Sequence, residues 1–203
     1  MAASDLPTGR PGPITRVVGV GAIVGAILWP IALGDVAARA VSVTQEGGGR
    51  LAGSSIAPLA IALILFTAAI AALEQRATRE MRFPDLVGDL TIATSAIVFV
   101  LAAVFGSYGL LGPGFVLLLG GSILFGATGF DGKRRPRWGS ALVGIGAGGL
   151  LASLLVAALG TDRVDGTVQT ALLSLALYAI GWAWLGLHLA LARPLVQPPG
   201  EPS

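Results

Sequence analysis

A long stretch in the middle of the chain carries no basic residue. From residue 83 to residue 132 there is no Lys and no Arg, and the acidic residues Asp85, Asp89 and Asp131 lie near its two ends. Apolar runs of similar character flank this stretch on both sides. An apolar helix of ~20 residues matches the ~30 Å hydrocarbon core of a bilayer. The sequence therefore predicts an all-α integral membrane protein rather than a water-soluble domain.

Six apolar segments are long enough to cross a membrane as helices, and each is apolar around its whole circumference. We predict a bundle of six transmembrane helices within residues 15–193, between flexible tails at 1–14 and 194–203. The spans lie at about 17–33, 54–73, 86–105, 115–130, 140–159 and 168–192. The region from 86 to 130 is too long for one crossing, and Gly106-Ser107-Tyr108-Gly109 and Gly112-Pro113-Gly114 supply the turn chemistry.

The distribution of basic residues predicts the orientation of this bundle. Six spans place ten of the thirteen Lys and Arg residues on one side and three, Arg39, Arg50 and Arg163, on the other. A single crossing through residues 86–130 would divide them six against seven. Because cytoplasmic loops retain positive charge, we expect six spans with both termini cytoplasmic. One basic run comprises Lys133, Arg134, Arg135 and Arg137. We interpret this run as a cytoplasmic anchor, and binding of anionic lipid headgroups is the alternative.

The first apolar run has two interpretations. Ala38-Arg39-Ala40 resembles the small-residue cleavage site of a secretory signal, but the apolar run is longer than the apolar region of most signals. We favour an uncleaved span and leave open whether the segment is cleaved in the cell. Twelve Arg against one Lys, together with abundant Ala and Gly, is typical of a GC-rich bacterial genome. The expected location is therefore the bacterial cell (inner) membrane, with multiple passes.

Composition also excludes several classes of function. The chain has no Cys and a single His, which excludes disulfides, thiolate metal sites and multi-histidine metal or haem sites. It contains no H-E-x-x-H, no G-x-S-x-G and no Walker A motif. The basic residues lie beside helix ends, so the net charge of +2 does not indicate nucleic acid. We expect no enzymatic activity, no metal and no cofactor.

Asp89 is the most informative polar residue, because a carboxylate one turn inside a span costs ~2–3 kcal/mol or more if it faces lipid. It should face protein or water. Two interpretations remain open for it. It belongs to a proton or ion site, in which His188 reaches the same depth, or it has a structural partner such as an Arg of the second loop or a neighbouring hydroxyl. His188 is otherwise an interfacial side chain. The candidate proton or ion site comprises Asp89, Thr91, Thr94, Ser95 and His188.

Aromatic residues near the end of the sixth span lie deeper than the usual interfacial belt. Tyr178, Trp182 and Trp184 are candidates for the wall of an apolar pocket that takes a lipid tail, a quinone or another hydrophobic substrate. Packing within the core is the simpler alternative.

Glycines at four-residue spacing, which lets helices approach closely in lipid, occur in the first and fifth spans: Gly21, Gly25, Gly144 and Gly148. These residues serve either oligomerisation or, more simply, packing inside the monomer. The sequence thus favours a non-enzymatic accessory or assembly component. Its partners would be the lipid bilayer, a second copy or another membrane protein. The alternative is a small-solute or proton-coupled transporter that uses Asp89 and His188.

Overall fold

The computed structural model describes residues 13–45, 53–77, 81–130, 135–159 and 164–191. These residues form helices and no strand, and six helices are long and apolar enough to cross a membrane. The predicted fold class is therefore confirmed. The predicted tails, apart from Pro13 and Ile14, and the anchor residues Lys133 and Arg134 lie outside the described residues.

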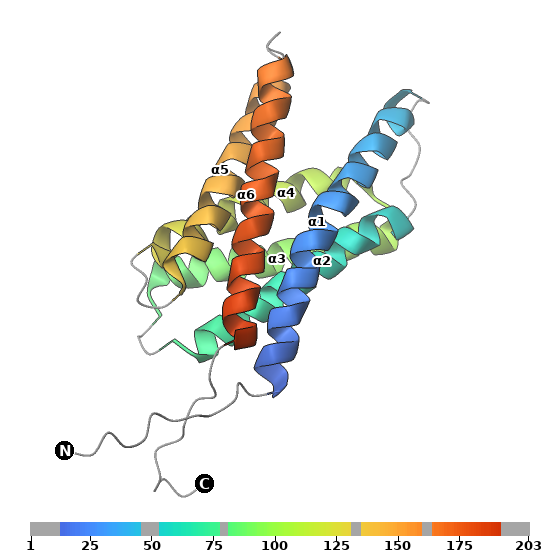
Figure 1. Ribbon diagram of the computed structural model, residues 1–203. Helices are drawn as coiled ribbons and strands as arrows, with labels where there is room; N and C mark the ends of the chain where they lie inside the picture. The colour runs from blue at the N-terminus through green and yellow to red at the C-terminus, as the bar shows by residue number, and fades with distance from the viewer. Residues whose placement is uncertain (1–12, 46–52, 78–80, 131–134, 160–163, 192–203) are drawn as a thin grey trace, which may run out of the picture.

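The helices form a closed ring in which each packs against its neighbours along the chain, and α1 packs against α6. The helices are α1 (Pro13–Gln45), α2 (Gly53–Gln75), α3 (Phe83–Phe105), α4 (Leu111–Gly129), α5 (Arg137–Ala158) and α6 (Val164–Leu191). In Figure 1, α3 and α4 cross behind α1 and α6 at a steep angle. The start of α1 and the end of α6 lie at the same end of the bundle, as six crossings require. That this end is cytoplasmic stays a prediction.

Helix α1 is much longer than the predicted span at 17–33. It extends over 33 residues, or ~50 Å, and continues through Pro30. We expected the helix to end near Asp35, and this expectation is wrong because α1 runs ten residues further, to Gln45. Arg39 Nε donates to Asp35 Oδ2 at 2.9 Å, one turn apart on an exposed face, and so offsets the charge of this carboxylate.

The turn between α3 and α4 forms at the first of the two predicted sites. Gly106 adopts a left-handed conformation with φ 59°, and its N–H donates to the carbonyl of Ala102. Glycine tolerates this conformation because it has no Cβ. A short 3-10 turn, η1 (Tyr108–Leu110), leads directly into α4. The second predicted turn, Gly112-Pro113-Gly114, is instead part of the first turns of α4. Backbone N–H groups at a helix start have no partner within the helix, so a proline there loses no hydrogen bond.

The centre of the ring is filled by aromatic side chains from every helix except α5. The closest ring pair is Phe66 and Trp182, which stack with centroids 4.4 Å apart. Phe99 and Phe115 meet edge to face at 5.1 Å. The aromatic core comprises Trp29, Phe66, Phe99, Phe115, Phe125, Tyr178 and Trp182. Offset and edge-to-face rings gain specific attraction beyond area burial, so this core fixes the relative positions of five helices.

Helix α5 contributes small residues where the others contribute rings. A Cβ added to Gly144 would lie 2.9 Å from Gly126 Cα on α4, and one added to Gly146 would lie 2.5 Å from the Tyr178 backbone nitrogen on α6. The backbone of α5 therefore approaches α4 and α6 more closely than any side chain at these positions would allow.

Candidate functional site

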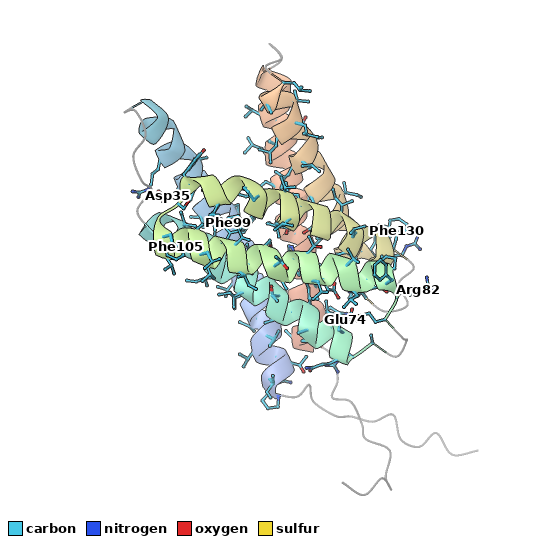
Figure 2. The ribbon with its side chains drawn as sticks, turned by 180° about the vertical axis from the view of Figure 1, so that it is seen from behind. Asp35, Glu74, Arg82, Phe99, Phe105 and Phe130 are labelled. Carbon is cyan, nitrogen blue, oxygen red and sulfur yellow. The ribbon has the colours of Figure 1, made fainter. Side chains whose placement is uncertain are left out.

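The most distinctive polar feature is a buried arginine that binds two carboxylates. Glu74 lies in the last turn of α2, Asp89 lies in the second turn of α3, and Arg135 lies two residues before the start of α5. Figure 2 shows Glu74 and Phe130 at the same end of the α2–α4 layer, with Asp35 and Phe105 at the other end. Three segments distant in sequence thus meet at one end of the bundle. We call Glu74, Asp89 and Arg135 the arginine clamp.

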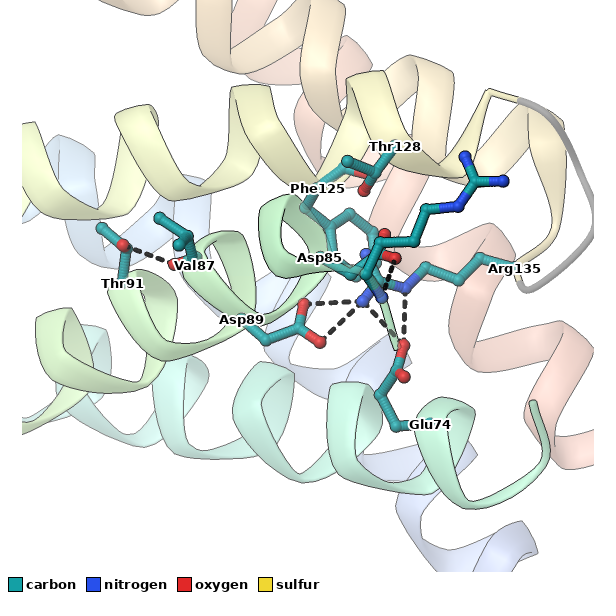
Figure 3. Close-up of polar contacts among 9 residues, drawn as sticks. Glu74, Asp85, Val87, Asp89, Thr91, Phe125, Thr128 and Arg135 are labelled. Carbon is teal, nitrogen blue, oxygen red and sulfur yellow. Dashed lines mark hydrogen bonds and ion pairs between the residues drawn. The ribbon is translucent and has the colours of Figure 1, made fainter. Parts of the chain in front are cut away.

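The geometry of the clamp is tight. Arg135 Nη2 lies 2.7 Å from Glu74 Oε1 and 2.6 Å from Asp89 Oδ2, and Arg135 Nε donates to the same Glu74 oxygen at 2.9 Å. The guanidinium carbon also lies 4.1 Å from the centre of the Phe125 ring. Figure 3 shows the arginine reaching between the two carboxylates, with the Phe125 ring beside it. Planar guanidinium groups suit such combined carboxylate and ring contacts.

Because the clamp is buried, its charged groups depend on one another as partners. The Arg135 side chain is 1% exposed, and the Glu74 and Asp89 side chains are 12% and 11% exposed. A cation at this burial requires anionic partners, and removing the cation from such a set costs ~3–5 kcal/mol. The clamp therefore holds α2, α3 and the segment before α5 together. Arg135 Nη1 is buried and has no partner among the described residues.

A third buried carboxylate lies beside the clamp and has a separate role. Asp85 accepts the backbone N–H of Arg82 through Oδ2 at 3.1 Å, and so caps the start of α3. Its negative charge also complements the positive end of the helix dipole.

Asp89 faces protein, but the three hydroxyls predicted to accompany it do not surround it. Thr91 Oγ1 donates to the Val87 carbonyl at 2.6 Å, as Figure 3 shows, and Thr94 Oγ1 donates to the Leu90 carbonyl at 2.7 Å. Ser95 Oγ donates to the Ile92 carbonyl at 2.6 Å. Each hydroxyl is therefore satisfied by its own helix.

His188 is not brought together with Asp89. Within the part of the chain that the structure describes, α3 and α6 are not neighbours. His188 instead lines a hollow of about 300 Å³ on α6 with Trp184, Leu187 and Leu191. The carboxylate and imidazole pair that the sequence suggested is therefore not formed.

Tyr178, Trp182 and Trp184 do not form one pocket either. Tyr178 and Trp182 are fully buried in the aromatic core, and Tyr178 Oη lies 3.1 Å from Ser122 Oγ. Trp184 is half exposed on the outside of α6. A cavity with apolar walls exists elsewhere, between α1, α4, α5 and α6, and Trp29 is its wall on the core side.

The four predicted helix-packing glycines divide into two groups. A Cβ at Gly21 would lie 3.1 Å from the Leu65 side chain, and one at Gly25 would lie 3.0 Å from Phe66, so both meet α2. Gly144 meets Gly126 of α4. Gly148 has no neighbour within 4 Å among the described residues. The first three therefore pack inside the monomer, and the four-residue spacing of Gly144 and Gly148 does not define one interface.

Two glycines of α6 make close contacts that the sequence interpretation did not include. A Cβ added to Gly181 would contact Val143 of α5, and one added to Gly186 would lie 2.6 Å from the carbonyl oxygen of Gly19 on α1. Close approach was predicted for the first and fifth spans, and α6 approaches its neighbours closely as well. The available signal was the presence of these two glycines in the sixth span.

Arg135 was assigned to the anchor with Arg137, and the structure separates these two residues. Arg137 is exposed, with its guanidinium carbon 4.9 Å from the centre of the Phe130 ring, whereas Arg135 is buried in the clamp.

In the described segments no three His, Cys, Asp or Glu side chains are grouped to hold a metal ion. Comparisons of the chain with protein-family models, curated proteins and solved structures found no match.

Proposed function

We propose that the protein is a non-enzymatic membrane component that acts through its outer faces, by packing against other membrane helices. The observation that carries this proposal is the closed interior. The aromatic core fills the centre of the ring, and the arginine clamp joins three segments at one end. A bundle built in this way leaves its lipid-facing surfaces as the surfaces available for interaction.

Helix α1 carries the outer face best suited to a helical partner. Exposed β-branched residues follow one another at alternating three- and four-residue spacing: Val17, Val20, Val24, Ile27 and Ile31. This is the spacing at which two helices interdigitate their side chains. β-Branched side chains have few rotamers to lose on packing, and in lipid the association of helices depends on packing.

The alternative function, a proton-coupled transporter, has less support. It requires Asp89 to exchange protons or cations along a polar path, and the Asp89 carboxylate is engaged by Arg135 at 2.6 Å and 2.8 Å. The neighbouring hydroxyls donate to their own helix, and among the described residues His188 lies on a helix that does not contact α3.

Crosslinking in the membrane tests the proposal. A photoreactive side chain at Val24 should give a protein adduct of discrete mass, whereas the same group at Ile97, exposed on α3, should give lipid adducts. The whole chain reconstituted in liposomes should pass protons no faster than empty liposomes. Proton flux above that level, abolished by Asp89→Asn, would establish the transporter instead.

We also place the protein in a bacterial cell (inner) membrane, because of the Arg-rich composition and the expected asymmetry of charge. Fractionation of the source cells tests this placement. Recovery of the protein in another membrane would contradict it.

A further inference from the structure

An apolar cavity of about 350 Å³ lies between four helices at the end of the bundle away from the arginine clamp. Its walls come from the second half of α1, the first half of α4, the second half of α5 and the start of α6. In Figure 1, α5 and α6 diverge from α1 toward this end, and α4 crosses behind them. The residues on which the inference rests are Trp29, Ala37, Leu119, Leu150, Ser153 and Ala171.

We propose that this cavity binds a single acyl chain of a membrane phospholipid. The helices that form the walls are the first reason. The lining residues all belong to helices that are apolar enough to span the membrane. Such helices are surrounded by hydrocarbon over most of their length, so lipid chains are the molecules present at the highest concentration.

The chemistry of the lining is the second reason. Leucine, valine, alanine and aromatic side chains make up most of the wall. Ser153 and Thr167 also line it; the Ser153 hydroxyl donates to the Gly149 carbonyl at 2.8 Å, and Thr167 is likewise not without a partner. A polar ligand would lose its hydrogen bonds to water on entering such a site. An acyl chain loses none.

The size of the cavity is the third reason. At about 350 Å³ the cavity lies at the lower end of the ~300–1,000 Å³ range of ligand pockets. A flexible chain of methylene groups fits a pocket of this volume.

A photoreactive phospholipid tests the proposal on the whole chain. The protein is reconstituted in dioleoyl phosphatidylcholine vesicles that contain a phosphatidylcholine with a diazirine within one acyl chain. Lipids that merely surround the bundle will label outward residues such as Ile145 and Leu155. A chain inside the cavity will label Leu119 or Leu150, which are 1% and 9% exposed. We expect labelling at these inward positions.

Two variants that fill the cavity and one matched control make the test specific. Ala37→Trp on α1 and Ala171→Trp on α6 each place a large side chain in the cavity, whereas Ala38→Trp places the same side chain one residue away, at an exposed position outside the lining. Labelling of Leu119 and Leu150 should fall at least fivefold in the first two variants and remain unchanged in the third. Thermal unfolding in detergent identifies any variant that fails to fold.

Three outcomes would overturn the proposal. The first is labelling confined to outward residues in the unaltered protein. The second is equal inward labelling in folded Ala37→Trp and Ala38→Trp. The third is coupling of a photoreactive side chain at Leu154, in the cavity wall, to a second polypeptide. None of these outcomes bears on crosslinking at Val24, so this proposal and the proposed function fail independently.

Discussion

Arg135 and Asp89, which are 46 residues apart in the chain, form a two-oxygen ion pair in which Nη2 lies 2.8 Å from Oδ1 and 2.6 Å from Oδ2. The same nitrogen binds Glu74, so one guanidinium serves two carboxylates. Loss of the arginine would leave both anions buried without their cation, whereas loss of either carboxylate leaves a neutralised pair. The three members are therefore not equivalent.

Replacing Arg135 by Met should destabilise the protein by ~3–5 kcal/mol, because two buried carboxylates lose their shared partner. Asp89→Asn should cost less, since Glu74 still neutralises the arginine. Thermal unfolding in detergent measures both effects. Arg137→Met is the matched control, because this arginine is exposed two residues away. Equal unfolding temperatures for the Arg135 and Arg137 variants would contradict a structural role for the clamp.

The contact between α4 and α5 predicts different results for two glycines of the same helix. Gly144→Leu should destabilise the bundle by at least ~1–3 kcal/mol, because a Cβ there would lie 2.9 Å from Gly126 Cα. Gly148→Leu should have little effect, because no described atom lies within 4 Å of its added Cβ. Unfolding temperature and mass in detergent are the measurements. A stable Gly144→Leu monomer would show that the helices separate at low cost.

Gly139 also belongs to this series. It lies near the start of α5, outside the four-residue spacing of Gly144 and Gly148, but its contacts indicate a larger effect than at Gly148. An added Cβ at Gly139 would lie 2.8 Å from the Leu185 side chain of α6. We therefore expect Gly139→Leu to destabilise the protein more than Gly148→Leu in the same assay, and the opposite order would contradict the α5–α6 contact.

The aromatic core predicts a large effect at Phe66, which stacks on Trp182 at 4.4 Å. Phe66→Ala should cost ~3 kcal/mol or more, because the neighbouring rings cannot fill the space that the side chain leaves. Trp184→Ala removes a larger ring from a half-exposed position and should cost much less. Intrinsic tryptophan fluorescence measures the unfolding of the Phe66→Ala variant, because Phe66 stacks on Trp182. A smaller loss of stability in Phe66→Ala than in Trp184→Ala would contradict the assignment of the core.

The orientation of the bundle is testable without a structure. Reporter fusions after Lys133 and after Arg163 should report opposite compartments, with the first in the cytoplasm, because ten of the thirteen basic residues belong to one side. Alkaline phosphatase and a fluorescent protein serve as complementary reporters. If both reporters lay in the same compartment, the chain could not cross the membrane six times.

The helices themselves were predictable because the bilayer imposes their length and composition. Pro84 and Asp85 indicated the start of α3, and Gly106 indicated its end. The long extension of α1 was not predicted, since residues 34–45 include charged and polar side chains and begin with a glycine. The segment contains no proline, and the helix continues through it.

The clamp was predictable only in part. The cost of a carboxylate facing lipid correctly placed Asp89 toward protein. The alternative of an arginine partner named an Arg of the second loop, which is wrong, because Arg135 comes from the segment before α5. The identity of that arginine was beyond the sequence. Arg135 lies among basic residues that a positive-inside argument treats as equivalent, and only the packing of α5 against α4 directs this one inward. The cavity likewise arises from the divergence of helices, which single-helix patterns do not encode.

The packing of α1 against α6 has a consequence for how the chain is made. Helix α1 is synthesised before α2 to α5 and finds one of its main neighbours only when α6 has been made, so Gly19 and the backbone around Gly186 meet late. Until then one flank of α1 is uncovered in the membrane, and a chain that stops short of α6 leaves the ring open. Such contacts between distant parts of a chain form slowly and leave intermediates exposed. Changes at Gly19 or Gly186 should therefore leave the ring open and reduce the amount of folded protein.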